Sequence, residues 1–158
     1  MADDDLKTRF WRFYMSHAPV VRHATTPWTA LAAPLAASRV ALVSTCGVHL
    51  AAQPPFDLAV RGGDPSFREL PADLDPADVA ISHGHYDEAA ARRDLNCVFP
   101  LQRLHELAAE GAIGAVAPRH YAFRGAIARP ARLIRDTAPE VARRLKADAV
   151  DVVLLVPC

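Results

Sequence analysis

Histidine and cysteine side chains stand at the ends of four apolar runs in the sequence. They are Cys46 and His49 at the run 39–46, His83 after 78–82, His120 after 113–118, and Cys158 after 151–156. Thiolates are nucleophiles, and a neutral imidazole can give or take a proton near neutral pH. Together these residue types suit nucleophilic chemistry assisted by proton transfer.

The runs that carry these residues are short and apolar, with β-branched side chains, which predicts buried strands. The last run is apolar without alternation, as in a strand covered on both faces. Leucines spaced over 101–108 predict a helix that ends at Gly111, and Thr137 with Glu140 has the form of a capping box at the start of another helix. Alternating strands and helices predict an α/β fold: a single domain with a largely parallel sheet flanked by helices, and a final strand at the C-terminus.

Parallel strands place their carboxyl ends at one edge of a sheet, and ligands bind beyond that edge. We therefore expect the histidines and Cys158 to line a shared cleft, formed partly by the long loop 53–77. The pattern His83-x-His85-x-Asp87 adds a second possibility. Two imidazoles and a carboxylate at this spacing can bind zinc, which with His120 would make a metal-dependent hydrolase. A polar turn in which Asp87 caps the next helix explains the same residues.

Residues 1–38 are predicted to form a helix over 6–16 and a connecting arm, and residues 39–158 the α/β domain. A buried parallel strand is normally followed by a crossover helix that covers it. Here the sequence ends on such a strand. We expect either another copy of the chain to cover it, giving a homo-oligomer, or the C-terminal part of the natural domain to be missing.

Composition excludes several classes of partner. Eighteen basic and eighteen acidic residues cancel, so no nucleic-acid or anionic-membrane partner is expected. No apolar run is long enough to span a bilayer, and the acidic start lacks the apolar stretch of a signal peptide. Three cysteines without close spacing suit a reducing cytoplasm with free thiols. Cys97 is expected to be buried.

Five ordered motifs extend this interpretation. They are Gly47-Val-His-Leu50, Gly63-Asp-Pro-Ser-Phe-Arg68, Ser82-His-Gly-His-Tyr-Asp87, Asp94-Leu-Asn-Cys-Val-Phe-Pro100 and Ala117-Pro-Arg-His-Tyr121. In this order they resemble the selenoprotein B family of glycine, sarcosine, betaine and D-proline reductases, from about Thr26 to the end of the chain. Our candidates for binding a small-molecule substrate come from these motifs and are His49, Asp64, Ser66, Arg68 and Asn96. An ordinary surface role is the alternative for Arg68, and a capping or turn role for Asn96.

The resemblance implies a reaction. In that family the last strand leads to a selenocysteine, or in some members a cysteine, whose selenolate or thiolate cleaves the carbon–nitrogen bond of a small amine or amino acid. A pyruvoyl-bearing partner subunit holds the amine, and dithiols reduce the oxidised centre. Selenocysteine is expected immediately after Cys158 in the natural protein, with Cys158, His83 and His120 as catalytic candidates. The chain as given is then an inactive truncation, or alternatively a non-catalytic subunit.

Overall fold

The computed structural model describes residues 9, 12–13, 16, 24–25, 29–84, 86 and 88–158. The chain divides into two compact units, Met1–Ala30 and Leu31–Cys158. The helix predicted over 6–16 lies mostly outside the described residues. All the candidate residues belong to the second unit, and His85 and Asp87 among them lie outside the described part of the chain. Within that part, no helix is long and apolar enough to cross a membrane.

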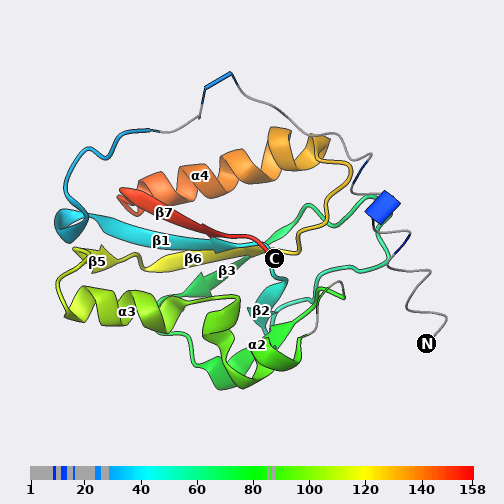
Figure 1. Cartoon of the computed structure of the whole chain (residues 1–158), viewed down its shortest axis with the longest axis horizontal. Coiled ribbons are helices and arrows are strands. Elements are labelled where there is room, and N and C mark those ends of the chain that lie inside the picture. The colour runs from blue at the N-terminus through cyan, green and yellow to red at the C-terminus, as the bar shows by residue number, and fades with distance from the viewer. Residues whose placement is uncertain are drawn as a thin grey trace. The chain divides into compact units, whose positions relative to one another are not determined.

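A five-stranded sheet is built around β1 (Arg39–Ser44). Parallel to β1 run β7 (Val152–Val156) along one side, and β5 (Ala115–Val116) followed by β6 (Arg119–Phe123) along the other. The outer strand β3 (Phe67–Pro71) is antiparallel to β6. In Figure 1 the carboxyl ends of β1, β6 and β7 converge near the C-terminus. The prediction of a mixed α/β fold with a mostly parallel sheet is confirmed.

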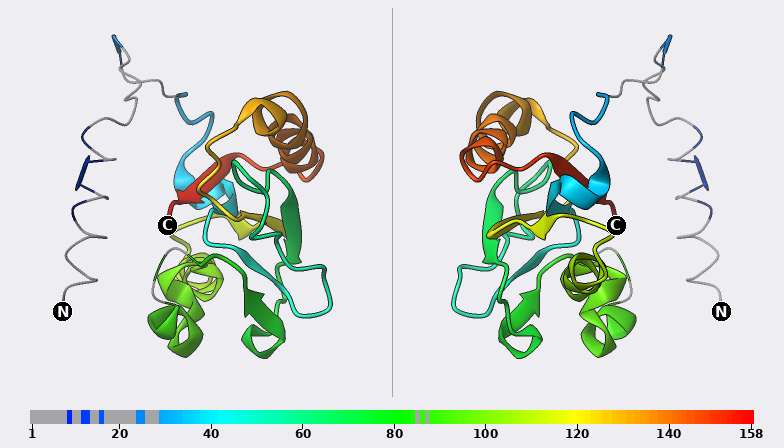
Figure 2. Two further views of the ribbon diagram at one scale, coloured as in Figure 1. Left: turned by 90° about the vertical axis from the view of Figure 1, so that its right-hand side faces the viewer. Right: turned by 90° about the vertical axis from the view of Figure 1, so that its left-hand side faces the viewer.

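Two cores cover the two faces of the sheet, because side chains along a strand alternate between faces. Leu42 of β1 packs with Leu101 and Leu104 of α3 (Leu101–Ala109) on one face. On the other face, Tyr121 packs with Val141 of α4 (Ala138–Ala147). The two helices accordingly lie on opposite sides of the sheet in Figure 2.

The remaining elements are short. They are the helical turns η1 (Leu35–Ala37), η2 (Pro76–Asp78), η3 (Leu95–Cys97) and η4 (Leu133–Thr137), the helix α2 (Ala89–Arg93), and the strands β2 (Val48–Leu50) and β4 (Val79–Ile81). The π-helical η4 leads directly into α4, so the predicted capping box at Thr137 is wrong. The Thr137 hydroxyl instead donates to the Pro65 carbonyl at 2.8 Å.

Two predicted strands of the parallel sheet are built differently. The run 78–82 forms β4, which pairs antiparallel with β2 in a separate two-stranded sheet. The run 113–118 gives only the two-residue β5. Pro118 has no N–H to continue the ladder, and the chain re-enters the sheet as β6. His120 therefore lies inside a strand rather than after one.

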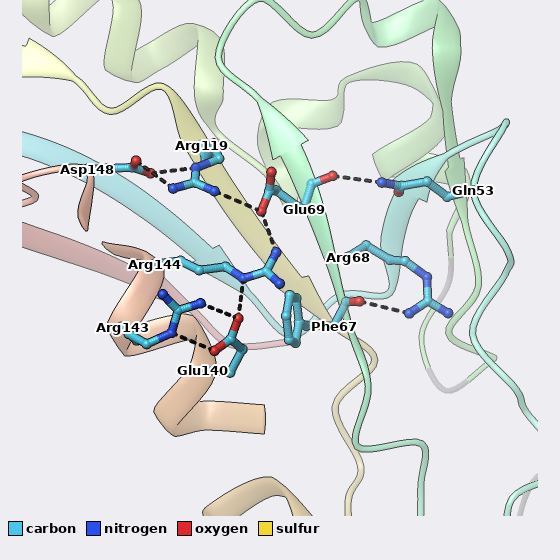
Figure 3. Close-up of polar contacts among 9 residues, drawn as sticks. All are labelled: Gln53, Phe67, Arg68, Glu69, Arg119, Glu140, Arg143, Arg144 and Asp148. Atoms are coloured by element: carbon cyan, nitrogen blue, oxygen red, sulfur yellow. Dashed lines mark hydrogen bonds and ion pairs between the residues drawn. The ribbon is translucent and has the colours of Figure 1, made fainter. Parts of the chain in front are cut away.

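A network of ion pairs holds α4 against β3 and β6 (Figure 3). Glu69 of β3 accepts from Arg144 of α4 at 2.8 Å and lies 3.5 Å from Arg119 of β6. Arg119 in turn makes a bidentate pair with Asp148, just after α4, at 2.6 and 2.8 Å. These side chains are partly exposed, so each pair contributes at most about 1 kcal/mol. Their joint effect is to fix α4 in register with the sheet.

The final strand is at the edge of the sheet, and its apolar side chains are exposed. The exposed fraction is 37% for Val153, 40% for Leu154 and 69% for Leu155. The sequence pattern predicts a strand covered on both faces, but the described residues leave these side chains exposed.

Candidate functional site

The carboxyl ends of β1, β6 and β7 are tied together by backbone hydrogen bonds. The Thr45 N–H donates to the Val156 carbonyl at 3.0 Å, and the Gly47 N–H donates to the Phe123 carbonyl at 2.9 Å. The Cys158 N–H donates to the Thr45 hydroxyl at 3.0 Å. Three strands from distant parts of the sequence therefore end at one place, beside the C-terminus in Figure 1.

Cys46 and Cys158 form a disulfide at this edge, with their Cα atoms 5.2 Å apart. Ser44 is the register partner of Val156, so the residues two further along each strand stand opposite each other. Parallel neighbours at this spacing meet the Cα separation that a disulfide requires. The expectation of free thiols is wrong for these two cysteines.

The third cysteine, Cys97, is free and exposed. The prediction that it is buried is wrong, because η3 is a surface turn without a buried residue: Leu95 packs against the core, but the chain is buried only from Val98 on.

His83 stands directly behind the disulfide-bearing turn. It is 3% exposed, and its ring lies 4.6 Å from the ring of Tyr86, centroid to centroid. The Tyr86 hydroxyl donates to the Cys46 carbonyl at 3.0 Å. Burial, followed by the nearby Glu88 carboxylate, raises the pKa of Tyr86 to about 12, so the hydroxyl keeps its proton as a donor.

Gly47 lets the chain turn between the disulfide and His83. Its φ is +70°, which L side chains rarely adopt, and a Cβ there would collide with the Ser82 carbonyl. The Ser82 N–H also donates to the Gly47 carbonyl at 2.9 Å. This close approach brings the end of β4 against the end of β1.

His120 does not share this site. It is 0% exposed and occupies the second position of β6, three residues before the strand ends. Its Nδ1 accepts the Leu42 N–H at 3.0 Å, and its ring meets the Phe99 ring edge-on. Burial, and secondarily the charge of His105, lowers the pKa of His120 to about 4. The imidazole is therefore neutral at pH 7 with its proton on Nε2, and the expected position beyond a strand end is wrong.

His49 is held by two hydrogen bonds within the small sheet. Its Nδ1 lies 2.8 Å from the Leu50 carbonyl, and its Nε2 lies 2.9 Å from the Ser82 hydroxyl. A carbonyl can only accept, so Nδ1 carries the proton and Nε2 accepts from Ser82 in the neutral ring. His49 thus pairs with the residue that precedes His83.

The predicted ligand-binding turn 62–68 folds the preceding loop onto itself. Asp64 accepts the N–H of Asp57 at 3.0 Å and that of Ser66 at 2.9 Å. Burial alone would raise the pKa of Asp64, but these hydrogen bonds and the charge of Arg68 outweigh it and leave the pKa lowered. Arg68 donates to the carbonyls of Pro54, Pro55 and Phe67 and to the Ser66 hydroxyl, and it stacks on Phe56. Figure 3 shows it pointing along this loop, away from α4.

Asn96 lies elsewhere, at a cavity of about 450 Å³ that it lines with Ala72 and His105. The Ala72 N–H donates to the Pro118 carbonyl, which places this cavity near the start of β6. The disulfide lies near the end of β6, five residues and roughly 16 Å away at about 3.3 Å per residue. The structure therefore separates Asn96 from His83 and Cys158.

Within the described residues, no group of three or more histidine, cysteine, aspartate or glutamate side chains is arranged to hold a metal ion. His85 and Asp87 of the predicted zinc motif lie outside those residues. His120, the fourth member of that set, is turned into the core by its bond to Leu42. The metal-dependent hydrolase gains no support from the geometry.

Comparisons with known proteins decide the family. The model of the glycine/sarcosine/betaine reductase selenoprotein B family matches residues 14–158. The chain belongs to this family. It is also 42% identical over 128 residues to the D-proline reductase subunit gamma of Acetoanaerobium sticklandii, which covers 81% of this chain and 52% of the relative. The chain thus spans about half the length of this curated relative. No solved structure matches the chain.

Membership of a selenoprotein family implies a selenocysteine in the natural protein.

Two residues beside the site, Tyr86 and Arg124, were not predicted from the sequence. Tyr86 bridges His83 to the turn of Cys46. Arg124 directly follows β6 and is only 6% exposed. Its neighbour Gly125 packs so closely that a Cβ there would lie 3.4 Å from His83 Nε2. In the sequence, the only indication of a role for Arg124 is that it stands with Gly125 directly after an apolar run.

Proposed function

We propose that this chain carries the nucleophile-bearing end of a reductase component that cleaves a carbon–nitrogen bond in a small amine or amino acid. One observation carries the proposal. The ends of β1, β6 and β7 bring Cys158, an exposed residue, to one edge of the sheet, with His83 next to the turn that carries Cys46. Family membership supports a reductase component.

The nucleophile is either the Cys158 thiolate or a selenolate at the next position of the natural protein. It attacks the carbon next to the amino group, the carbon–nitrogen bond breaks, and the leaving amine takes up a proton. His83 is our candidate for the donor of that proton, because its ring lies beside Tyr86 and Gly125 at the ends of β1 and β6. We retain His120 only as a positioning residue for β1, since its ring is enclosed in the core.

The relative's length and the family description support a longer natural protein, in which a selenocysteine follows Cys158. A pyruvoyl-bearing subunit that holds the amine and a dithiol that restores the reduced centre complete the proposed reaction. Binding of the substrate by His49, Asp64, Ser66 or Arg68 stays a prediction, and each of these side chains has a structural contact that accounts for it. Asn96 stays a prediction of the same kind, at the separate cavity.

The experiment begins with the codon after that of Cys158, which we expect to be an in-frame selenocysteine codon. The extended protein, made in a host that inserts selenocysteine, is assayed with its partner subunit, a dithiol and glycine, sarcosine, betaine or D-proline in turn. Amine release with one of the four is expected, and the 158-residue chain should show none. No release with any substrate from a selenium-loaded protein would overturn the proposal.

A histidine pair tests the proton donor. His83→Gln should lower kcat by about 10²- to 10⁴-fold, the usual contribution of a positioned acid. His105→Gln is the matched control, because His105 is exposed and its ring bonds the Ala72 carbonyl at the far cavity. Equal activity of the two variants would remove His83 from the mechanism.

A further inference from the structure

The two cysteines at the strand ends differ in access to solvent. Cys158 is exposed, whereas Cys46 is 0% exposed and belongs to the apolar core on the α3 face. A reagent in solution therefore meets Cys158 before it meets Cys46. Cys46 can be reached only by a sulfur in the position that Cys158 occupies.

Hydrogen bonds hold the backbone of the buried cysteine in place. The Cys46 N–H donates to the Ser44 hydroxyl at 3.1 Å, and its carbonyl accepts the Tyr86 hydroxyl. The Cys158 N–H donates to the Thr45 hydroxyl. The Val156 carbonyl lies 4.0 Å from the Cys46 sulfur, where it can accept the thiol proton in the reduced state. The two hydrogen bonds at the Cys46 backbone therefore hold this residue in the core.

We infer that Cys46 and Cys158 form a redox pair in which Cys158 reacts first and Cys46 resolves the product. In exchange with a small disulfide, the Cys158 thiolate attacks one sulfur and releases the other half as a thiolate. The Cys46 thiolate then attacks the Cys158 sulfur, forms the internal disulfide and releases the second half. Two protein thiols lose two electrons and two protons, and the small disulfide gains both.

The substrate side of this inference rests on the proposed function. Reductive cleavage converts a carbon–nitrogen bond into a carbon–hydrogen bond and an amine, which needs two electrons and two protons. One dithiol supplies them by becoming a disulfide. An external dithiol then returns the pair to its reduced form by exchange. The structure thus provides a resolving thiol just after β1, 112 residues before Cys158.

The test uses the reduced 158-residue chain carrying Cys97→Ser, because Cys97 is an exposed thiol outside the pair. The aromatic disulfide DTNB releases one coloured thiolate for each protein thiol it oxidises. We expect two thiolates per chain and a final mass 2 Da below that of the reduced protein, with no adduct left. A stable adduct on Cys158, or release of one thiolate only, would overturn the inference.

Two further variants in the Cys97→Ser chain separate the roles. Cys46→Ala keeps the core apolar and should release one thiolate and retain one adduct on Cys158. Cys158→Ser leaves only the buried thiol and should react at least about 100-fold more slowly than the parent chain. Fast reaction of Cys46 in this variant would contradict the assigned order. If Cys46→Ala does not fold, Cys158→Ser and the mass of the parent chain still decide.

This assay needs no substrate and no partner, so its outcome is independent of the reductase assay. If the chain exchanges as expected but the extended protein releases no amine, only the proposed function is refuted. A reductase that works while the pair fails to exchange would sink the inference alone.

Discussion

Acid should destabilise this protein through His120, and a single substitution should remove the effect. The pKa of His120 is lowered from 6.5 to about 4 by burial and by His105. A histidine with a lowered folded pKa is protonated first in the unfolded chain, so stability falls as the pH drops below about 6.5 and levels off below about 4. Between pH 7 and pH 5, the two pKa values give a loss of about 2 kcal/mol.

His120→Asn is the perturbation of choice. The Asn side-chain oxygen stands where Nδ1 does and can still accept the Leu42 N–H, but it does not titrate. His120→Leu removes the acceptor as well and leaves a buried amide unpaired, which costs about 1–3 kcal/mol. The difference between the two variants at pH 7 therefore measures the hydrogen bond, and the difference between wild type and His120→Asn across pH measures the proton.

Urea denaturation at pH 5 and pH 7 gives both quantities. We expect wild type to lose about 2 kcal/mol more than His120→Asn over this interval, with equal m-values. Direct titration of the imidazole by NMR should give a value well below 6.5. An identical pH dependence in the two proteins, or titration of His120 near 6.5, would refute the reasoning.

Three other outcomes follow from single contacts. Gly47→Ala should cost about 3 kcal/mol or more, because a Cβ there meets the Ser82 carbonyl, whereas Gly111→Ala, at φ +74° but in open space, should cost only about 1 kcal/mol in thermal denaturation. Leu155→Lys on the exposed edge strand should reduce self-association measured by light scattering, while Leu107→Lys on α3 should not; a clean monomer in wild type would contradict the expected homo-oligomer. Glu69→Gln should lower the free energy of unfolding by at most about 1 kcal/mol, since its ion pairs are half-exposed and salt should abolish the difference.

Local pattern was enough to predict the main elements. The β-branched run of β1 and the apolar run of β7 are strands in the structure, and the leucine spacing of α3 gives a helix. Period-2 and period-3.6 apolar patterns are properties of the chain itself, so they survive whatever packs around them. The meeting of β1 and β7 at one edge also followed, because parallel strands in α/β folds end on the same side.

The features that the sequence did not predict depend on partners far along the chain. Nothing near His120 shows that its ring accepts the Leu42 N–H, 78 residues away. The antiparallel pairing of β2 with β4 likewise depends on a contact between Gly47 and Ser82. Short strands carry too few residues for their own pattern to choose a sheet, so tertiary contacts choose it.

The sequence by itself determined that Cys46 and Cys158 follow strands, and that these strands belong to an α/β sheet of a reductase family. Only the tertiary structure decided which of them meet. The register of β1 with β7 placed Cys46 opposite Cys158, while Pro118 shifted β6 and drew His120 into the core. Register is set by hydrogen bonds between strands that lie more than 100 residues apart, and no local pattern records it.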